Sequence, residues 1–321
     1  MPRPPSHRRP TEFASIPFGV CYYPEHWDEA TRARDPERMA AAGVRVVRMG
    51  EFAWDLFESE PGRYDFSLHR AAVARLGEHG IRTILCTPTA APPAWLTRRH
   101  PEILRVDAKG VRLEHGSRQH ASHMAPAFRA ASRAITQAMA EAFRGMGEVI
   151  GWQTDNEFHC HFSEDHSDAA QHAFRDWLRR RYAGDIAELN AAWGTAFWAQ
   201  SYRGFDEIAT PKDGLPTYQN PHARLDYVQF LSDAVGEFQA EQIAILRAVQ
   251  PRWWITHNGL FNHIDYRGPV GADLDVLGWD CYPHFIYDEV HRAYWQARGL
   301  DWARSWTGNL IVPEQQAGPG G

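Results

Sequence analysis

Two glutamates each come directly after an apolar stretch of strand length. Glu157 follows GWQTDN at 151–156, and Glu314 follows NLIVP at 309–313. Glycoside hydrolysis needs such a pair, because one carboxylic acid protonates the leaving oxygen while a second carboxylate attacks the anomeric carbon. A single Asn-Glu pair is more often a solvated loop. The prediction therefore depends on both glutamates ending strands of one sheet.

The pair also has to meet geometric and protonation requirements. A direct covalent displacement needs carboxyl groups about 5 to 5.5 Å apart. Near neutral pH, Glu157 must hold a proton while Glu314 is ionised. Asn156, beside Glu157, would hydrogen-bond the sugar hydroxyl next to the reacting carbon, where the bond strengthens as positive charge develops.

Short β-branched runs alternate with longer amphipathic stretches, and this alternation indicates βα units and a parallel sheet. We expect an α/β fold, a (β/α)8 barrel. Its expected strands lie at 18–23, 44–49, 81–87, 149–154, 253–258, 276–282 and 309–313, and its expected helices at 35–42, 68–79, 127–146, 169–182, 225–249 and 288–296. The sequence predicts seven strands, whereas a (β/α)8 barrel has eight. We therefore expect the last βα unit to be missing from this chain.

The connections differ in length on the two sides of the expected barrel. Gly43 and Gly80 lead straight from a helix into the next strand, as tight connections at the bottom of a barrel do. The segments 88–125 and 156–168 are long and rich in Pro, His, Trp and Arg. Because barrel enzymes keep their active sites on the face formed by such βα loops, both glutamates are expected there.

Several further motifs carry a specific resemblance. From residue 18 onward the sequence resembles the β-galactosidases of glycoside hydrolase family 42. The matching pieces are GVCYYPEHW at 19–27, MGEFAW at 49–54, EPGRYDF at 60–66, TP at 87–88, PAWL at 93–96, DNEF at 155–158, LN at 189–190, AWGT at 192–195 and EQQAGP at 314–319.

The resemblance implies a retaining exo-β-galactosidase that works through a covalent glycosyl-enzyme intermediate. In that reaction the acid/base is Glu157 and the nucleophile is Glu314. The substrate-binding residues implied or suggested are Arg118, Asn156, Tyr282, Asp280, Trp54 and Trp193. Asp280 is a weaker candidate than Tyr282, and each tryptophan could equally be a core residue.

The sequence departs from the family pattern at a structural zinc site. Many members hold zinc with four cysteines, whereas here the first position corresponds to Ala121 and only Cys160 remains in the 158–165 segment. His159, His161 and His166 could supply other ligands, but a tetrahedral site needs four. We expect no metal and no cofactor.

Composition restricts the partners. The net charge of −6 and pI near 6.3 leave no basic surplus for nucleic acid. No apolar run approaches membrane-spanning length, and the basic N-terminus lacks the apolar core of a signal peptide. We expect a cytoplasmic protein with a disordered extension at 1–15 and a catalytic barrel at 16–321, acting on a galactoside or galacto-oligosaccharide. The resemblance suggests a homotrimer for the full-length protein.

Two alternatives stay open. One is a barrel that binds carbohydrate without hydrolysing it. The other is a related retaining enzyme, a β-fucosidase or an α-L-arabinopyranosidase, whose sugars differ from galactose at C6.

Overall fold

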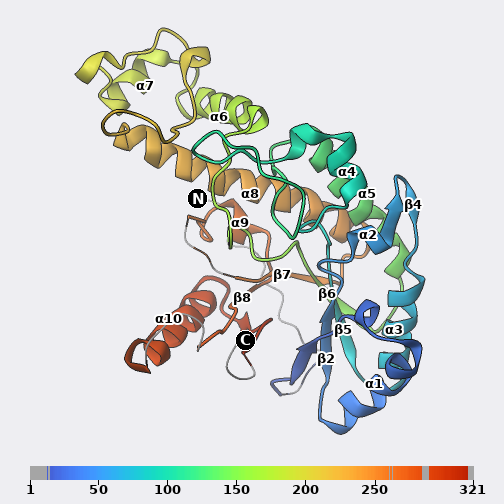
Figure 1. Ribbon diagram of the computed structural model, residues 1–321. Helices are drawn as coiled ribbons and strands as arrows, with labels where there is room; N and C mark the ends of the chain where they lie inside the picture. Colours follow the sequence, from blue (N-terminus) through green and yellow to red (C-terminus); the bar gives the residue numbers. More distant parts are fainter. Residues whose placement is uncertain (1–12, 14, 260, 262, 284–288, 317–321) are drawn as a thin grey trace.

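The computed structural model describes residues 13, 15–259, 261, 263–283 and 289–316. Within these residues, seven strands form one sheet in the order β1-β2-β5-β6-β7-β8-β9, and all neighbouring pairs are parallel (Figure 1). All seven predicted strands are therefore confirmed. The strands are β1 (Gly19–Cys21), β2 (Val46–Met49), β5 (Arg82–Cys86), β6 (Val149–Gln153), β7 (Trp254–His257), β8 (Val276–Gly278) and β9 (Leu310–Ile311).

Helices connect these strands, and the six predicted ones are all present. The described residues also form four short helices, four 3-10 turns and a small antiparallel hairpin in the long loops, which were not predicted. The α-helices are α1 (Glu29–Ala41), α2 (Trp54–Phe57), α3 (Ser67–Glu78), α4 (Ala94–Arg99), α5 (Pro126–Phe143), α6 (Asp168–Arg181), α7 (Ile186–Trp193), α8 (Pro221–Val249), α9 (Pro269–Ala272) and α10 (Glu289–Thr307). The hairpin is β3 (Glu58–Glu60) with β4 (Arg63–Tyr64), and the 3-10 turns are η1 (Pro24–His26), η2 (Pro101–Ile103), η3 (Phe197–Ala199) and η4 (Phe205–Glu207).

Side chains along each strand point alternately to the two faces of the sheet. Val47, Leu85 and Leu277 belong to the main core, which also contains helix residues such as Phe128 and Val235. Successive side chains of a strand point to opposite faces, so the neighbours of these residues line the concave face. There, a second apolar cluster joins Val46, Ile84, Ile150, Trp254, Val276 and Ile311.

The sheet curls far enough to bring its two edge strands together. The thiol of Cys21 on β1 donates to the carbonyl of Pro313, which follows β9, at 3.7 Å. This curl makes the chain a barrel-like sheet rather than a flat one. Gly151 permits the tight interior, since a Cβ on it would lie 2.5 Å from the indole of Trp254.

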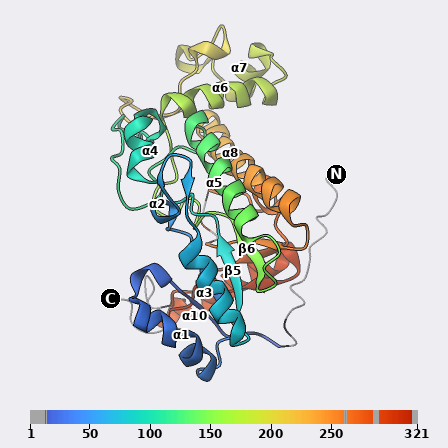
Figure 2. The same cartoon turned by 90° about the vertical axis from the view of Figure 1, so that its right-hand side faces the viewer.

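A further apolar cluster lies beyond the sheet. It joins α6, α7 and the first half of α8 through residues such as Phe174, Leu189, Tyr227 and Phe230. In both views α6 and α7 stand at the end of the molecule away from the strands (Figures 1 and 2).

The helix α1 begins six residues before its predicted start. Asp28 caps it by accepting the backbone N–H of Thr31 at 2.7 Å, and the helix continues through Pro36. The prediction had placed the start at Asp35. Proline removes one N–H donor but does not end a helix whose other bonds are made.

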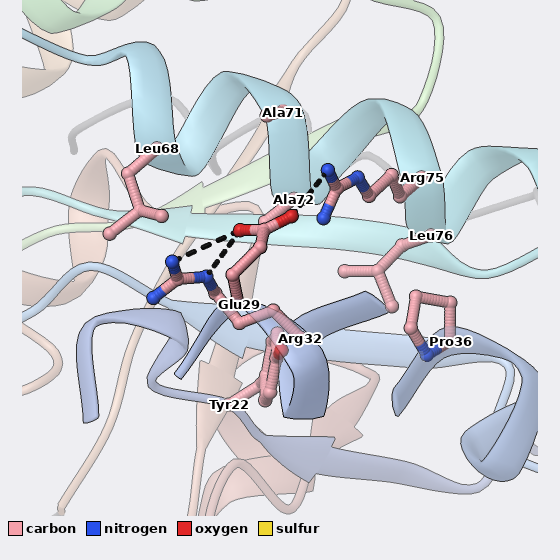
Figure 3. Close-up of a pocket in the computed structure, with 9 residues that line it drawn as sticks. All are labelled: Tyr22, Glu29, Arg32, Pro36, Leu68, Ala71, Ala72, Arg75 and Leu76. Carbon is pink, nitrogen blue, oxygen red and sulfur yellow. Dashed lines mark hydrogen bonds and ion pairs between the residues drawn. The ribbon is translucent and has the colours of Figure 1, made fainter. Parts of the chain in front are cut away.

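Figure 3 shows the cavity between α1 and α3. It measures about 40 Å³, and Glu29 lies at its side with ion pairs to Arg32 at 3.0 Å and Arg75 at 2.8 Å. A space of this size holds about one water molecule. The cavity is therefore too small for a sugar.

The predicted extension at 1–15 falls mostly outside the described residues. Phe13 is described, and it packs against the concave-face cluster that includes Ile150 and Trp254. The part of the EQQAGP motif at 317–319 also lies outside them. Among the described residues, no helix is both long and apolar enough to cross a membrane.

Candidate active site

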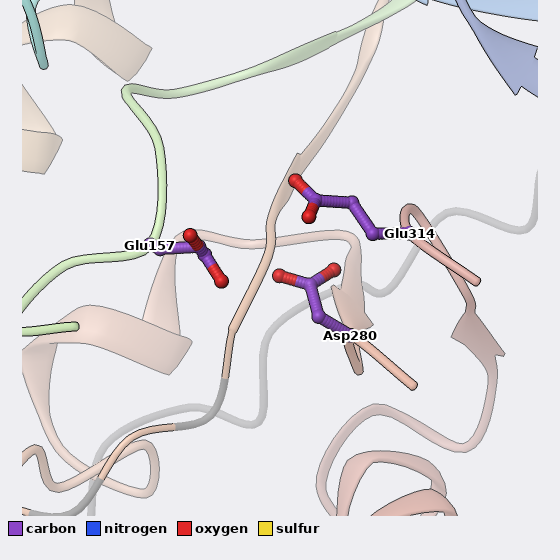
Figure 4. A group of neighbouring side chains, drawn as sticks. All are labelled: Glu157, Asp280 and Glu314. Carbon is purple, nitrogen blue, oxygen red and sulfur yellow. The ribbon is translucent and has the colours of Figure 1, made fainter. Parts of the chain in front are cut away.

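Three carboxyl groups meet at the carboxyl ends of three strands. Glu157 follows β6, Asp280 follows β8 and Glu314 follows β9, and one oxygen of each lies within 4.8 Å of an oxygen of both others (Figure 4). The two predicted catalytic glutamates are thus side by side. The sheet curl accounts for this, since β6 and β9 are separated by two strands but end at the same rim.

The backbone that carries Glu157 has an unusual conformation. Asp155, Glu157 and His159 all have positive φ, at 53°, 46° and 65°. For residues other than glycine such angles cost about 1 to 3 kcal/mol each, and they persist only where surrounding contacts hold them. Here Asn258 accepts the Glu157 N–H at 2.9 Å.

His257, at the end of β7, gives a second backbone contact. Its Nε2 accepts the Phe158 N–H at 3.2 Å, and its Nδ1 contacts the Thr154 carbonyl at 2.7 Å. Burial lowers the pKa of His257 to about 4. The ring is therefore neutral at pH 7, with its proton on Nδ1, and it fixes the loop without adding charge.

The side chain of Glu157 is bound by two donors. Arg118 Nη1 lies 3.0 Å and Asn156 Nδ2 lies 3.2 Å from the same oxygen, Oε2. Arg118 also contacts His161 Nε2 at 2.6 Å. Two predicted substrate-binding residues thus lie at the acid/base candidate.

Glu314 is held from three sides. Arg48 Nη2 and Asn258 Nδ2 donate to its Oε1 at 2.7 and 3.1 Å, and the Tyr282 hydroxyl donates to its Oε2 at 2.5 Å. Burial, followed by the Glu314 contact, raises the pKa of Tyr282. The phenol therefore stays protonated and can act as a donor to the carboxylate.

Arg48, on β2, is 5% exposed. It donates to Glu51 at 2.9 Å and to the Gln153 amide oxygen at 3.0 Å, in addition to Glu314. Burial disfavours its charge, but the Glu51 carboxylate leads the opposing effects and holds the pKa of Arg48 well above its usual value. The Tyr23 hydroxyl donates to the same Glu51 oxygen at 2.7 Å.

Comparisons with known proteins agree with this geometry. The sequence model of the family described as Beta-galactosidase, Glyco_hydro_42, matches residues 21–320. The chain belongs to glycoside hydrolase family 42.

Most of this chain is similar in sequence and structure to known beta-galactosidases. It is 46% identical over 269 residues to the beta-galactosidase BgaA of a Thermus species, a match covering 83% of this chain and 41% of the relative. The solved beta-galactosidase of the psychrophilic Marinomonas ef1 superposes with a TM-score of 0.89 at 37% identity, covering 94% of this chain and 48% of that one. The enzyme from the haloarchaeon Halorubrum lacusprofundi superposes with a TM-score of 0.89 at 39% identity, covering 94% and 47%. The chain thus spans somewhat less than half the length of these relatives.

An open cavity of about 700 Å³ is lined by Glu314 together with Arg118 and Tyr282. This volume is within the range of small-molecule sites. Its lining includes Tyr23, Phe52, Asp55, residues 91–94, His115, Ser117, Arg118, Tyr282 and Glu314.

The two tryptophans suggested as aromatic walls lie elsewhere. Trp54 is 0% exposed in the main core and donates its Nε1–H to Glu58 at 2.8 Å. Trp193 is 3% exposed in the cluster of α6, α7 and α8, where it donates to Asp226 at 2.8 Å. Neither indole presents a face to the cavity, because each is surrounded by core side chains and bonded on its only polar atom. As placed, both are core residues, which was the alternative interpretation.

Arg48, Glu51 and Asn258 belong to the site although no role was predicted for them. A signal existed for two of them: Arg48 interrupts the apolar run 46–49, and Asn258 ends a buried strand just as Asn156 does. Their partners could not be read from the sequence, because Arg48 and Glu314 are 266 positions apart.

The positions related to the family's zinc cysteines have other contacts here. Ala121 is buried opposite Leu104 in an isolated bridge. His166 bonds Thr210 and Glu164, and His161 bonds Arg118. Burial and the nearby Glu157 carboxylate raise the pKa of the Cys160 thiol to about 12. The expectation that no metal is bound stays a prediction.

Proposed function

We propose that this chain carries the catalytic centre of a retaining exo-β-galactosidase, with Glu157 as acid/base and Glu314 as nucleophile. The observation that carries the proposal is the approach of the two carboxyl groups to within 4.8 Å at one rim of the sheet. Retaining glycosidases have carboxyls about 5 to 5.5 Å apart, whereas inverting enzymes need about 6.5 to 9.5 Å to admit a water molecule. Family membership supports a galactoside as the substrate.

In this proposal the Glu314 carboxylate attacks the anomeric carbon while Glu157 gives its proton to the leaving oxygen. A covalent galactosyl ester forms on Glu314. Glu157, now ionised, then takes a proton from the water that breaks the ester. Arg48, which contacts Glu314 at 2.7 Å, favours the ionised nucleophile.

Arg118 and Asn156 are proposed to hold sugar hydroxyls beside the reacting carbon. Both already donate to Glu157 Oε2. A substrate hydroxyl would accept from the same two donors, either in place of Glu157 or in addition to it. Tyr282, 37% exposed at the cavity, is proposed to orient Glu314 while facing the sugar.

The test is hydrolysis of 4-nitrophenyl β-D-galactoside by the wild type, Glu157→Gln and Glu314→Ala. Glu78→Gln, an exposed change on α3, is the control. We expect both active-site variants to lose activity by several orders of magnitude and the control to lose none. Activity near the wild-type level in either active-site variant would refute the assignment.

Azide separates the two roles. It should restore turnover of Glu314→Ala and give the α-galactosyl azide, whereas an acid/base variant should give the β-azide. The 4-nitrophenyl β-D-fucoside and α-L-arabinopyranoside test the C6 preference. Galactose binding without hydrolysis of any of these substrates would favour the non-catalytic carbohydrate-binding barrel.

A further inference from the structure

We propose that Asp280 is a positioning residue that remains a neutral carboxylic acid and donates a hydrogen bond to Glu157. This inference rests on the proposed function, since it assigns a role to the third carboxyl group of the same site. It gives Asp280 a role other than the substrate binding suggested from the sequence.

The geometry places Asp280 beside both catalytic candidates. It is 8% exposed, and its carboxyl group points toward Glu157 and Glu314 from the end of β8 (Figure 4). One of its oxygens lies within 4.8 Å of an oxygen of Glu157 and of an oxygen of Glu314, so the three carboxyl groups face one another. Two carboxyl groups can share a hydrogen bond only when one of them holds a proton.

Each of the two glutamates lies beside an arginine, whereas Asp280, within the described part of the chain, does not. Arg48 pairs with Glu314 at 2.7 Å, and Arg118 pairs with Glu157 at 3.0 Å. Among the described residues, no arginine or lysine lies within ion-pair distance of Asp280. Its Oδ2 receives the amide of Asn258 at 2.9 Å, and its buried Oδ1 receives no donor.

A buried carboxyl group without a cation of its own, beside two other carboxyls, strongly favours its protonated form. In agreement, burial, followed by the charges of Glu314 and Glu157, raises the pKa of Asp280 well above its usual value. The titratable groups facing it are Arg48 of β2, Glu157 and Cys160 of the loop after β6, Tyr282 after β8 and Glu314 after β9.

A proton on Asp280 has a direct use in the proposed reaction. Glu157 becomes ionised when it protonates the leaving group, and at that moment its Oε2 already receives Arg118 and Asn156. A donor from Asp280 stabilises the new charge without transferring the proton. A carboxylate at Asp280 would instead oppose the ionisation of both glutamates.

The first test compares Asp280→Asn with Asp280→Ala, using Asp213→Asn as an exposed control. The amide of Asp280→Asn can still donate, whereas alanine cannot. We expect Asp280→Asn to keep at least about ten times the kcat/KM of Asp280→Ala, the ratio expected for one hydrogen bond to a charged group. Equal loss in the two variants, with both folded by circular dichroism, would overturn the proposal because it would mean that the carboxylate charge is needed.

The pH profile gives a readout that a structural role would not change. The wild type should lose kcat/KM at alkaline pH as Asp280 ionises, and Asp280→Asn should lack that component. Identical alkaline limbs would count against the proposal. So would activity that requires Mg²⁺ and disappears with a chelator, since the three carboxyls would then be a cation site.

An infrared difference spectrum between the wild type and Asp280→Asn at pH 7 needs no catalysis. We expect a carbonyl band of a protonated carboxylic acid that is present only in the wild type. Its absence overturns the proposal even if galactosides are hydrolysed. Its presence in a protein that hydrolyses no galactoside would instead refute the proposed function and leave the protonation of Asp280 intact.

Discussion

Replacing Asn258 with alanine removes the side chain that joins the two halves of the site. Its Oδ1 accepts the Glu157 N–H at 2.9 Å, and its Nδ2 lies 3.0 Å from Asn156 Oδ1, 2.9 Å from Asp280 Oδ2 and 3.1 Å from Glu314 Oε1. An amide nitrogen has two hydrogens, so at most two of those three acceptors are served at once. The variant therefore loses three hydrogen bonds.

The expected cost follows from these contacts. Each bond contributes roughly 1 kcal/mol net, and a buried N–H left without an acceptor costs about 1 to 3 kcal/mol. We expect Asn258→Ala to lower the free energy of unfolding by about 3 to 5 kcal/mol. Because the Glu157 backbone is held at a φ of 46°, its release should also displace the acid/base and lower kcat/KM by about 100-fold.

Urea denaturation and hydrolysis of 4-nitrophenyl β-D-galactoside measure the two effects separately. Asn258→Asp is the matched variant, since it keeps the acceptor for Glu157 but replaces the donor amide with a charge facing Asp280 and Glu314. Asn309→Ala, just before β9, is the control. The reasoning fails if Asn258→Ala changes the unfolding free energy by less than about 1 kcal/mol, the value of a single hydrogen bond, and leaves kcat/KM unchanged.

Three further predictions concern stability. Burial raises the pKa of Asp155 from 3.8 to about 6, so the folded state binds its proton more tightly than the unfolded state. The contribution of Asp155 to stability is therefore fully present below pH 4 and falls by about 3 kcal/mol as pH rises through 6. Urea midpoints should lose this pH dependence in Asp155→Asn, and an unchanged dependence would contradict the assignment. Gly151→Ala should lower the free energy of unfolding by about 1 to 3 kcal/mol through the clash with Trp254, whereas Gly147→Ala, whose Cβ meets nothing within 4 Å, should not. Trp54→Phe should lower the melting temperature but leave KM unchanged; a raised KM would restore its role as an aromatic wall.

The local pattern was sufficient to predict the seven strands and the two glutamates. A buried strand of a parallel sheet reads as a short apolar run in the sequence. Because burying a charge is costly, a carboxyl group directly after such a run is unusual and indicates a functional position. Helix positions followed from periodicity, but boundaries did not: a cap outside the periodic segment, Asp28, sets the start of α1, and α10 continues to Thr307, beyond its predicted end at 296.

The tertiary structure alone decided which polar groups surround the two glutamates. Arg48 reaches Glu314 only because the sheet curls until β9 lies near β1, and this closure depends on contacts hundreds of positions apart in the chain. Asn258 and Asp280 lie near Glu314 because β7 and β8 end at the same rim of the sheet as β9. The same packing decided that Trp54 and Trp193 belong to the core, since an indole fits a core and a sugar site equally well by residue type. Residue type specifies what a side chain can do chemically, and long-range packing specifies which partners it has.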